Sequence, residues 1–523
     1  MAADPKGIIY SKFFRYLWVG GLVLFTAQFV GLIIWSRFLW DHFDLTTDMA
    51  SFSQAFSEIG RGHLDPYMST VAYNYPHYGY SFYQDHFSLI MWPLSLLYTL
   101  SHTSFTLLVV QDFALAGTGL IAYSWGLDII SSTDTLKRSE STFIGCGLLL
   151  MLIANPWTYW TASFDFHIQP LALFFSLICV RDIWHNKSRV WIWVLLVLLC
   201  GDVATTYLVV AGITALSFGR KSRSKGIALL LAALGLFAIV GILHAGNGSH
   251  LETDFQYLAH GQVPKGLLGI VVIASGILIH PMTAIRVLQH RFSNISNYVT
   301  ASGTLGLFSV IGLSGFLFVI ATNSLDKYSV FISKLASFQN LAGVLFILIG
   351  WVFVARYLLY TIRSHRKPRW TIVTQILVFL ALSASIGQVG FESYTYIPQV
   401  KPRFAKVSSQ SAFQLSRVLA QTTPGSEVVA SQGVVGRFAN HKWVIPYISA
   451  FANGQTIALN RSQTDFILAV NQGIESATPS ETEFAIKFLE QNGAQLRSYA
   501  HGIAFLIYTR KPHQLSITIP NTS

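Results

Sequence analysis

Long apolar segments recur from the N-terminus to about residue 390 and are separated by short loops, several of which are basic. A helix crosses the hydrocarbon core of a bilayer with about 20 consecutive apolar residues, and shorter segments are tolerated inside a helix bundle. Only 11% of the 523 residues are charged, whereas about 25% are charged in a typical soluble protein. The sequence therefore predicts a polytopic α-helical membrane protein.

The lengths of the apolar segments predict about eleven spans. They lie near 16–38, 105–127, 142–154, 168–182, 190–201, 203–219, 226–244, 266–287, 302–322, 341–362 and 371–390. The segment 16–38 follows three basic residues and lacks a small-residue cleavage pattern, so we expect an uncleaved first span. The apolar segment Phe87–Leu100 is short and contains Pro93, so we expect an interfacial or re-entrant helix there rather than a crossing.

The positions of the basic residues predict the orientation of the spans, because cytoplasmic loops carry an excess of Lys and Arg. With the N-terminus inside, every basic loop between the expected spans falls on the cytoplasmic side. The extracytoplasmic side then receives a long first loop, about 39–104, the segments 155–167, 245–265 and 323–340, and everything after about 391. The expected C-terminus is therefore outside.

The net charge of +11 does not indicate a nucleic-acid partner, because the basic residues are concentrated in these short loops. The three cysteines, Cys146, Cys179 and Cys200, lie in or beside apolar segments. They form no CxxC motif and no metal-ligand spacing, so the sequence predicts neither a disulfide framework nor a zinc site.

Residues 398–523 differ in composition from the membrane part, 1–397, and we expect a small extracytoplasmic α/β domain there. Four segments are typical of strands: Val428–Ala430, Trp443–Tyr447, Asp465–Val470 and Ile503–Tyr508. The sequence Thr478-Pro479-Ser480-Glu481 resembles a capping box with proline at the first helical position. Asn492-Gly493 is a typical helix end, so the sequence predicts a helix between these two signals.

Two carboxylates follow the first span closely. Asp44 and Asp48 share a face if their segment is helical, because residues four apart are neighbours on a helix. A carboxylate that faces a polar cavity acts as a general base once its surroundings tune its pKa. The alternative is that both are solvated charges favoured by the dipole at a helix N-terminus. Apolar residues after Asp48 would pack its helix onto the membrane, which favours a functional role for Asp48.

Acidic residues and histidines also recur at three later positions. Asp85-His86 precedes the interfacial helix, and Asp165-x-His167 lies in the second outer segment. Such pairs suit metal ligation, phosphate binding or acid–base work, and the alternative is a structural cap or a satisfied interfacial pair. Gly201-Asp202 interrupts an apolar stretch, and a broken helix is tolerated where its freed backbone lines a cavity. For Asp202 the alternative is a structural hydrogen bond to a neighbouring helix.

Four charged residues are weaker candidates. Asp112 would line a cavity, although a charge at the end of a span is the commoner explanation. A lipid phosphate requires cationic groups, and Arg61, Arg286 and Lys334 are the available candidates.

The segment Asp48–Phe56, with Gly62, resembles the start of a family of bacterial and archaeal polytopic membrane proteins known as DUF2079. In that family a Gln follows the Asp by about six residues, as Gln54 does here. An Asp-His pair and a Phe-x-x-His-like element come next, and an acidic pair lies in a broken helix. The matches here are Asp85-His86, Phe164–His167 and Gly201-Asp202, the last without its Glu. The chain departs from the family at Ala50, which replaces a Gly, and at Phe338-Gln339, which replaces a common His-Tyr.

The resemblance covers essentially the whole chain, and the family in turn resembles the GT-C superfamily of membrane glycosyltransferases. It implies a GT-C-like fold, in which a sugar passes from a polyprenyl-phosphate carrier to an extracytoplasmic acceptor with inversion. Asp48 would be the general base. The residues that would bind the sugar, the phosphate or a divalent ion are Asp85, His86, Asp165 and His167, with Asp202 orienting one of these groups. We expect Asp44 and Gln54 to contribute to substrate binding.

These features predict an inverting glycosyltransferase of the cell membrane with an active site on its outer face. Its partners would be the lipid-linked sugar donor, a cell-envelope acceptor and the bilayer. The sequence leaves open whether Mg²⁺ or Mn²⁺ takes part. A transporter or flippase for a lipid-linked or small polar substrate is the alternative, because broken helices with a buried Asp suit transport as well. A third reading is a non-catalytic scaffold that presents residues 398–523 to an envelope partner.

Overall fold

The chain folds as two compact units in the computed structural model. The first comprises Met1–Gly31, Asp112–Thr161 and Ile168–Ile397, and the second comprises Leu32–Gln111, Ala162–His167 and Pro398–Ser523. The structure describes residues 5–70, 80–132, 136–243, 255–259, 266–325, 341–364, 368–423, 425–448, 454–470, 473 and 477–520. The second unit therefore joins the C-terminal part of the chain to the loop after the first apolar segment.

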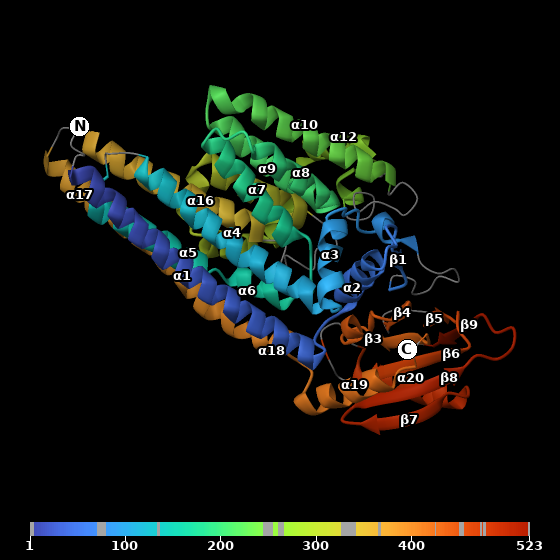
Figure 1. Cartoon of the computed structure of the whole chain (residues 1–523). Helices are drawn as coiled ribbons and strands as arrows, with labels where there is room; N and C mark the ends of the chain where they lie inside the picture. The colour runs from blue at the N-terminus through green and yellow to red at the C-terminus, as the bar shows by residue number, and fades with distance from the viewer. Residues whose placement is uncertain are drawn as a thin grey trace. The chain divides into compact units, whose positions relative to one another are not determined.

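The first unit is helical (Figure 1). Helix α1 (Pro5–His42) begins in this unit and continues into the second, whereas α4 (Phe105–Ser131) begins in the second unit and continues into the first. The other helices of the first unit are α5 (Arg138–Ile153), α6 (Pro156–Ser163), α7 (Gln169–Trp184), α8 (Val190–Leu199), η2 (Gly201–Val203), α9 (Ala204–Ser217), α10 (Arg220–Leu243), η3 (Gln256–Ala259), α12 (Gly266–Ile279), α13 (Pro281–His290), α14 (Phe292–Ala301), η4 (Thr304–Phe308), α15 (Val310–Val319), η5 (Ile320–Ser324), α16 (Leu341–Ser364) and α17 (Pro368–Tyr396).

Among the described residues, six helices are long and apolar enough to cross a membrane, or seven if the bent pair α12–α13 forms one span. The six are Phe13–His42, Phe105–Ser131, Arg138–Ser163, Arg220–Ile242, Leu341–Ile362 and Ile372–Phe404. The expected number of eleven is not confirmed. The difference arises because several expected spans form helices below the length of a full crossing, including α8 with 10 residues and α9 with 14.

The expected span 302–322 is interrupted by glycines. The backbone at Gly303 has a positive φ of 77°, and the 3₁₀ helix η4 follows it. A Cβ on Gly306 would lie 1.9 Å from the carbonyl oxygen of Ile347, so only glycine allows α16 to approach this closely. The hydroxyl of Ser309 then accepts a hydrogen bond from Gly312 N and caps α15. One apolar stretch therefore becomes two short helices.

The expected span 266–287 also bends. Helices α12 and α13 meet at an angle of 88° around His280. Pro281 has no N–H to continue the helix, and a residue before proline is disfavoured in the α conformation. His280 accordingly has φ −127° and ψ 62°.

The segment Phe87–Leu100 contains a helix that is too short to cross a membrane, as expected. This helix, α3 (Met91–Ser101), has 11 residues and ends at His102, whose φ of 50° is left-handed. The indole of Trp92 donates a hydrogen bond of 2.9 Å to the carbonyl oxygen of Leu64.

The second unit contains a helical part from the first loop and a sheet from the C-terminal segment, which we define as Pro398–Ser523. The loop part contributes α2 (Thr47–Gly60), β1 (Tyr67–Met68), β2 (Tyr80–Ser81), η1 (Phe82–Gln84) and α3. Residues Ile397–Gln399 form η7. The C-terminal segment contains α18 (Val400–Phe404), α19 (Ser409–Gln421), β3 (Glu427–Ser431), η8 (Val435–Phe438), β4 (Trp443–Tyr447), β5 (Gln455–Ala458), β6 (Gln463–Ala469), α20 (Pro479–Gln491), β7 (Gln495–Ala500), β8 (Ile503–Thr509) and β9 (Ser516–Ile519).

The four strands expected in this segment are confirmed as β3, β4, β6 and β8, within one five-stranded sheet of order β4-β3-β6-β8-β7. Strand β3 pairs in parallel with β4 and β6, whereas β8 pairs antiparallel with β6 and β7. Successive side chains of a strand point to opposite faces of a sheet. Val428 and Ala430 accordingly face a cluster that includes α19, whereas Val429 faces one that includes α20.

The capping box is also confirmed. The hydroxyl of Thr478 accepts a hydrogen bond from Glu481 N, and Thr478 N donates to Glu481 Oε2 over 2.8 Å. Proline occupies the first helical position of α20, and the helix ends at Gln491, before Asn492-Gly493. This helix is specified almost entirely by its local sequence.

Candidate functional site

Helix α2 begins at a sharp turn after α1. Phe43 has a positive φ of 61° between the two helices, and Thr46 is the N-cap residue of α2. The side chain of Thr46 makes no cap hydrogen bond of its own to α2. Asp48 lies in the first turn of α2, where the positive end of the helix dipole favours a carboxylate.

The N-terminus of α2 is capped by Asp165, which lies far away in the sequence. The Asp165 carboxylate accepts hydrogen bonds from Thr46 N at 2.9 and 3.0 Å and from Met49 N at 2.9 Å. It also accepts one from the Thr46 hydroxyl at 2.6 Å. The first backbone N–H groups of a helix have no intrahelical partner, so a buried carboxylate here supplies what the N-cap residue does not. The geometry makes Asp165 the residue that fixes where α2 begins.

His167 joins Asp165 to Asp48. Its Nε2 lies 3.1 Å from Asp48 Oδ2, and its Nδ1 lies 2.9 Å from the carbonyl oxygen of Asp165. A carbonyl oxygen and a carboxylate both accept hydrogen bonds, so both ring nitrogens must donate, which is the arrangement of an imidazolium. The backbone N–H of His167 donates to Gln111 Oε1 at 2.8 Å, and the Phe164 ring stacks on the imidazole. The ring is therefore held on three sides.

The pKa values of this group follow from the same contacts. Burial would raise the pKa of Asp48, but the hydrogen bond and charge of His167 and the charge of His86 outweigh it and lower the pKa below 3.8. Burial would lower the pKa of His167, but Asp48 outweighs it and raises the pKa above 6.5. Burial, together with the charge of Asp48, raises the pKa of Asp165 to about 6. Both the lowered pKa of Asp48 and the raised pKa of His167 favour an ion pair between these two side chains.

Aromatic rings surround this ion pair. The ring of Phe52, one turn after Asp48 on α2, lies edge-to-face with Phe166 at 5.2 Å. The imidazole of His86 stacks on the other side of Phe52 at 5.0 Å, and its Nε2 lies 3.2 Å from Asp85 Oδ2. The rings of Phe52 and Phe166 are buried, whereas the Asp48 side chain remains 42% exposed. The structure thus brings together four of the predicted site residues around Asp48: Asp85, His86, Asp165 and His167.

Asp44 is buried next to the C-terminal segment. Its Oδ1 accepts hydrogen bonds from Lys406 N at 2.9 Å and Val407 N at 3.0 Å. Burial raises the pKa of Asp44 to about 7, against the opposing effect of these two hydrogen bonds. Its contacts are those of a structural carboxyl.

Gln54 is also buried, and its amide is fully engaged. Its Nε2 donates to Ser69 Oγ at 3.0 Å and to the carbonyl oxygen of Lys442 at 2.7 Å, and its Oε1 accepts from Ser69 N at 2.9 Å. Gln54 therefore connects α2 to the residues after β1 and to the start of β4.

Asp202 belongs to the first unit, at the expected break between two short helices. Gly201 has a positive φ of 75°, and η2 separates α8 from α9. Asp202 Oδ1 accepts a hydrogen bond from Val203 N at 2.7 Å. The alternative that the sequence left for this residue was a hydrogen bond to a neighbouring helix, whereas this hydrogen bond joins Asp202 to the next residue.

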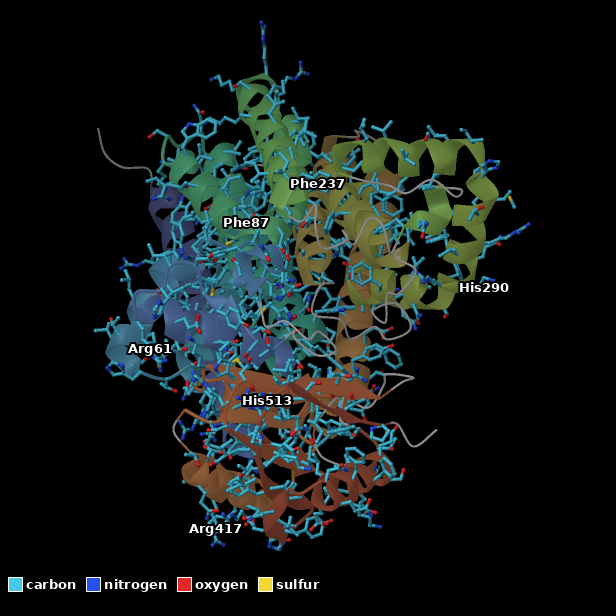
Figure 2. The ribbon with its side chains drawn as sticks, turned by 90° about the vertical axis from the view of Figure 1, so that its right-hand side faces the viewer. Arg61, Phe87, Phe237, His290, Arg417 and His513 are labelled. Atoms are coloured by element: carbon cyan, nitrogen blue, oxygen red, sulfur yellow. The ribbon has the colours of Figure 1, made fainter. Side chains whose placement is uncertain are left out.

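The weaker candidates lie elsewhere. Arg61 follows α2 at the end opposite to Asp48 and is exposed, with one nitrogen 3.5 Å from the Tyr98 hydroxyl (Figure 2). Asp112 is buried within α4, and Arg286 is exposed on α13. Lys334 lies outside the described residues, as do Phe338 and Gln339.

Metal ligation was one expected role for Asp85, His86, Asp165 and His167. In the described part of the chain, no three His, Cys, Asp or Glu side chains are grouped so that they could hold a metal ion. The hydrogen bonds of Asp165 explain part of this finding, because its oxygens are already directed at the backbone of α2.

Sequence reasoning missed three residues of this group. The Thr46 hydroxyl donates a hydrogen bond to Asp165, and Gln111 Oε1 accepts one from the backbone of His167. The ring of Phe52 contacts the imidazoles of both His86 and His167. A Thr before a helix beginning is the only local signal among them, since Ser, Thr, Asp and Asn are the preferred N-cap residues. The other two are recognisable only from the fold.

Comparison with known proteins gives a family match and matches to solved structures. Residues 40–494 match the family described as "Predicted membrane protein (DUF2079)". Among solved structures, the chain is similar to ArnT from Cupriavidus metallidurans, in a crystal structure bound to undecaprenyl phosphate. That similarity covers 93% of this chain and 98% of ArnT, with 11% sequence identity and a TM-score of 0.40. No curated protein matches this chain.

Proposed function

This chain belongs to the DUF2079 family of predicted membrane proteins, and we propose that it is a membrane glycosyltransferase with Asp48 as its general base. The sugar would pass from a polyprenyl-phosphate carrier to an extracytoplasmic acceptor of the cell envelope. The observation that carries this proposal is the Asp48–His167 pair, fixed at 3.1 Å at the beginning of a helix that follows the first span. A half-exposed carboxylate held in one orientation suits proton abstraction from a bound hydroxyl.

The reaction is a single displacement. The acceptor hydroxyl oxygen attacks the anomeric carbon, and its proton moves to the Asp48 carboxylate as the new C–O bond forms. The bond from the anomeric carbon to the phosphate oxygen breaks, and both of its electrons stay on the polyprenyl phosphate. Attack opposite to the leaving group inverts the anomeric configuration. The low pKa of Asp48 keeps the base ionised at neutral pH, and it accepts the proton only once the attacking oxygen has become acidic.

The other site residues take distinct roles. His167 orients Asp48 through Nε2, and Asp165 holds the helix beginning through its carboxylate and the His167 ring through its carbonyl oxygen. His86 is a candidate for binding the donor phosphate, because its imidazole is partly exposed and stacks on Phe52 of α2. Asp44 and Gln54 would support α2 rather than touch the substrate, since their polar atoms are directed at backbone groups and at Ser69.

The experiment that tests this proposal is mass spectrometry of envelope glycans from cells that lack the protein. The cells are complemented with wild type, with Asp48→Asn or with Asp41→Asn. Asp41 is a matched control because its carboxylate is exposed and pairs with Arg37 within α1. We expect one glycan to disappear and to return with wild type and Asp41→Asn. Asp48→Asn should restore less than about 1% of it, since a general base contributes roughly 100- to 10,000-fold.

Two results would contradict the proposal. If no envelope glycan changes in cells lacking the protein, the transferase activity is rejected, and transport of a lipid-linked or polar substrate is tested next. If Asp48→Asn restores the glycan at normal protein levels, Asp48 is not the base.

A further inference from the structure

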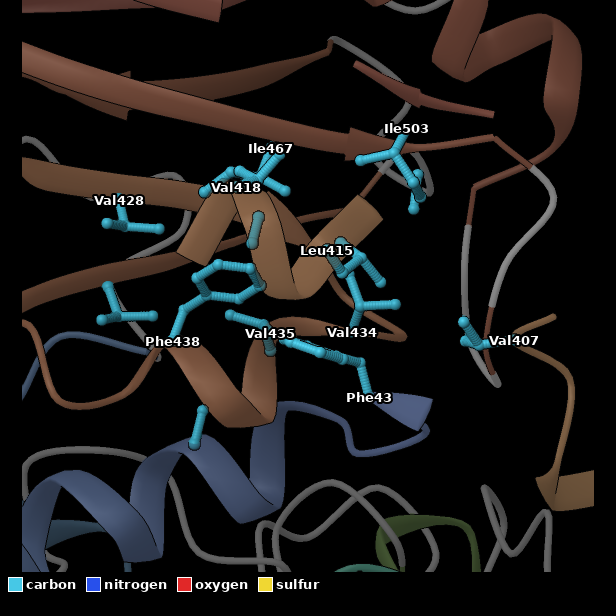
Figure 3. Close-up of a cluster of buried hydrophobic side chains, with 14 of the residues drawn as sticks. Phe43, Val407, Leu415, Val418, Val428, Val434, Val435, Phe438, Ile467 and Ile503 are labelled. Carbon is cyan, nitrogen blue, oxygen red and sulfur yellow. The ribbon is translucent and has the colours of Figure 1, made fainter. Parts of the chain in front are cut away.

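The turn before Asp48 is part of the core of the C-terminal segment. Phe43 lies in the buried cluster that contains Val434, Val435 and Phe438, and its ring is 5.8 Å from that of Phe438 (Figure 3). Ala50, from the first turns of α2, belongs to the same cluster. Residues on both sides of Asp48 are therefore buried against the C-terminal segment.

The backbone of this turn also contacts η8 directly. Gly436 N donates a hydrogen bond of 3.0 Å to the carbonyl oxygen of Leu45. A Cβ on Gly436 would lie 2.7 Å from Leu45 Cβ and 3.0 Å from the Leu45 backbone carbonyl. The absence of a side chain at Gly436 is thus what allows η8 to lie against the chain three residues before Asp48.

Two further contacts to the same turn involve ionisable side chains, Asp44 within the turn and Arg437 of η8. Asp44 accepts the N–H groups of Lys406 and Val407, as described above. The guanidinium of Arg437 lies over the ring of Phe43 at 4.4 Å, in the range of a cation–π contact. The turn is therefore contacted by the segment before α19 as well as by η8.

A second group of contacts connects α2 to β4. Gln54 binds Ser69 and the carbonyl oxygen of Lys442, and Ser69 Oγ donates to the carbonyl oxygen of Val444 at 2.9 Å. Val444 N donates back to Ser69 Oγ at 2.9 Å. Ser69 and Gln54 are both buried, so these hydrogen bonds form away from water.

From these contacts we propose that the C-terminal segment positions the proposed base: η8 and β4 hold the turn 43–46 and helix α2, and so set the location of Asp48. This inference rests on the proposed function, because it assigns residues that act on Asp48 rather than on the substrate. Gly436, Ser69 and Gln54 are positioning residues in this sense.

The substitution that tests it is Gly436→Ala, because the new methyl group forces the Leu45 backbone to move. Gly390→Ala is the matched control, since a Cβ on Gly390 meets nothing within 4 Å. In purified full-length protein, we measure hydrogen–deuterium exchange of the amides in Thr47–Phe52. We expect faster exchange in Gly436→Ala than in wild type or Gly390→Ala, because a helix end that loses its contacts opens more often.

Glycan formation per unit of protein is then measured in four strains: wild type, Gly436→Ala, Asp48→Asn and the double variant. A displacement of the base by about 1 Å costs up to roughly 100-fold in rate, so we expect a 10- to 100-fold loss in Gly436→Ala. If Gly436 acts through Asp48, the same substitution causes no further loss in the Asp48→Asn background. A merely structural role would reduce both backgrounds by the same factor.

Ser69→Ala is the second variant, in case Gly436→Ala does not fold, with the exposed Ser462→Ala as its control. Unchanged exchange in both test variants overturns the positioning role, and so does an equal loss in both backgrounds. If amide exchange in α2 is faster in the test variants but no glycan depends on this protein, the proposed function fails. The role of the C-terminal segment in holding α2 is then still supported.

Discussion

At the residue scale, the site depends on two hydrogen-bond acceptors that favour the protonated form of the His167 ring. Its two ring nitrogens face a carboxylate and a carbonyl oxygen, so both nitrogens are hydrogen-bonded only while the ring is protonated. The ion pair contributes to stability only where both partners are charged. The pH dependence of stability therefore tests whether His167 is protonated in the folded protein.

The sign of that dependence follows from the two pKa shifts. The pKa of Asp48 is lowered from 3.8, so its contribution is present above about 3.8 and is lost as the pH falls further. The pKa of His167 is raised from 6.5, so its contribution is full below 6.5 and is lost as the pH rises through the raised value. We expect the Asp48–His167 pair to stabilise the protein most between these limits.

The measurement is the thermal unfolding midpoint of wild type and His167→Gln in nanodiscs at pH 5 to 9. The difference between the two should be largest near pH 5 to 6 and should shrink at alkaline pH. A hydrogen bond to a charged group is worth roughly 1.5–3 kcal/mol, which corresponds to a shift of about 1–3 °C for a chain of this length. A difference that stays constant across this range would contradict the imidazolium assignment.

At the element scale, helix α2 has an N-terminus that its own sequence does not cap. Asp165 does this from 119 positions away, and the C-terminal segment holds the turn before it. Local stability at this helix end therefore depends on tertiary contacts.

Asp165→Asn tests this dependence. The amide NH₂ of Asn would face the N–H groups of Thr46 or Met49, and the charge that these groups face is lost. We expect a loss of about 1–3 kcal/mol and faster amide exchange confined to the first turn of α2. Asp41→Asn, which removes an exposed ion pair, should change the unfolding midpoint little. Equal effects of the two substitutions would argue against the cap.

At the scale of the whole molecule, the distribution of basic loops predicts that the C-terminal segment lies outside the cell membrane. The same orientation places the turn 43–46 and Asp48 on that side, because they belong to one compact unit with the C-terminal segment. The proposed reaction, which uses an extracytoplasmic acceptor, requires this orientation.

Reporter fusions to full and truncated chains test the orientation. Alkaline phosphatase, which is active only outside the cytoplasm, should be active after Ser523 and inactive after Lys221, in the basic loop that begins α10. A fluorescent protein that matures in the cytoplasm should give the opposite pattern. Active phosphatase after Lys221 would contradict the predicted topology and, with it, the side of the membrane assigned to Asp48.

The local sequence was sufficient wherever one short pattern encodes an element. The capping box predicted α20, short segments typical of strands predicted β3 and β6, and apolar length predicted α4, α10, α16 and α17. The pairs Asp85-His86 and Asp165-x-His167 were recognisable as candidates because charge is costly near hydrocarbon. The number of spans was harder, because glycines such as Gly306 break an apolar stretch only when a neighbouring backbone approaches.

Only the tertiary structure decided which candidates meet. Asp165 and His167 reach Thr46 and Asp48 across 119 positions, and Gln54 reaches Lys442 across 388. The sequence determined by itself that this protein crosses a membrane repeatedly and has polar residues in its loops, since hydrophobic length and local capping depend on neighbours along the chain. Hydrogen bonds between distant segments depend on packing. These bonds explain why Asp48 is half-exposed, whereas Asp44, only four residues away, is buried and structural.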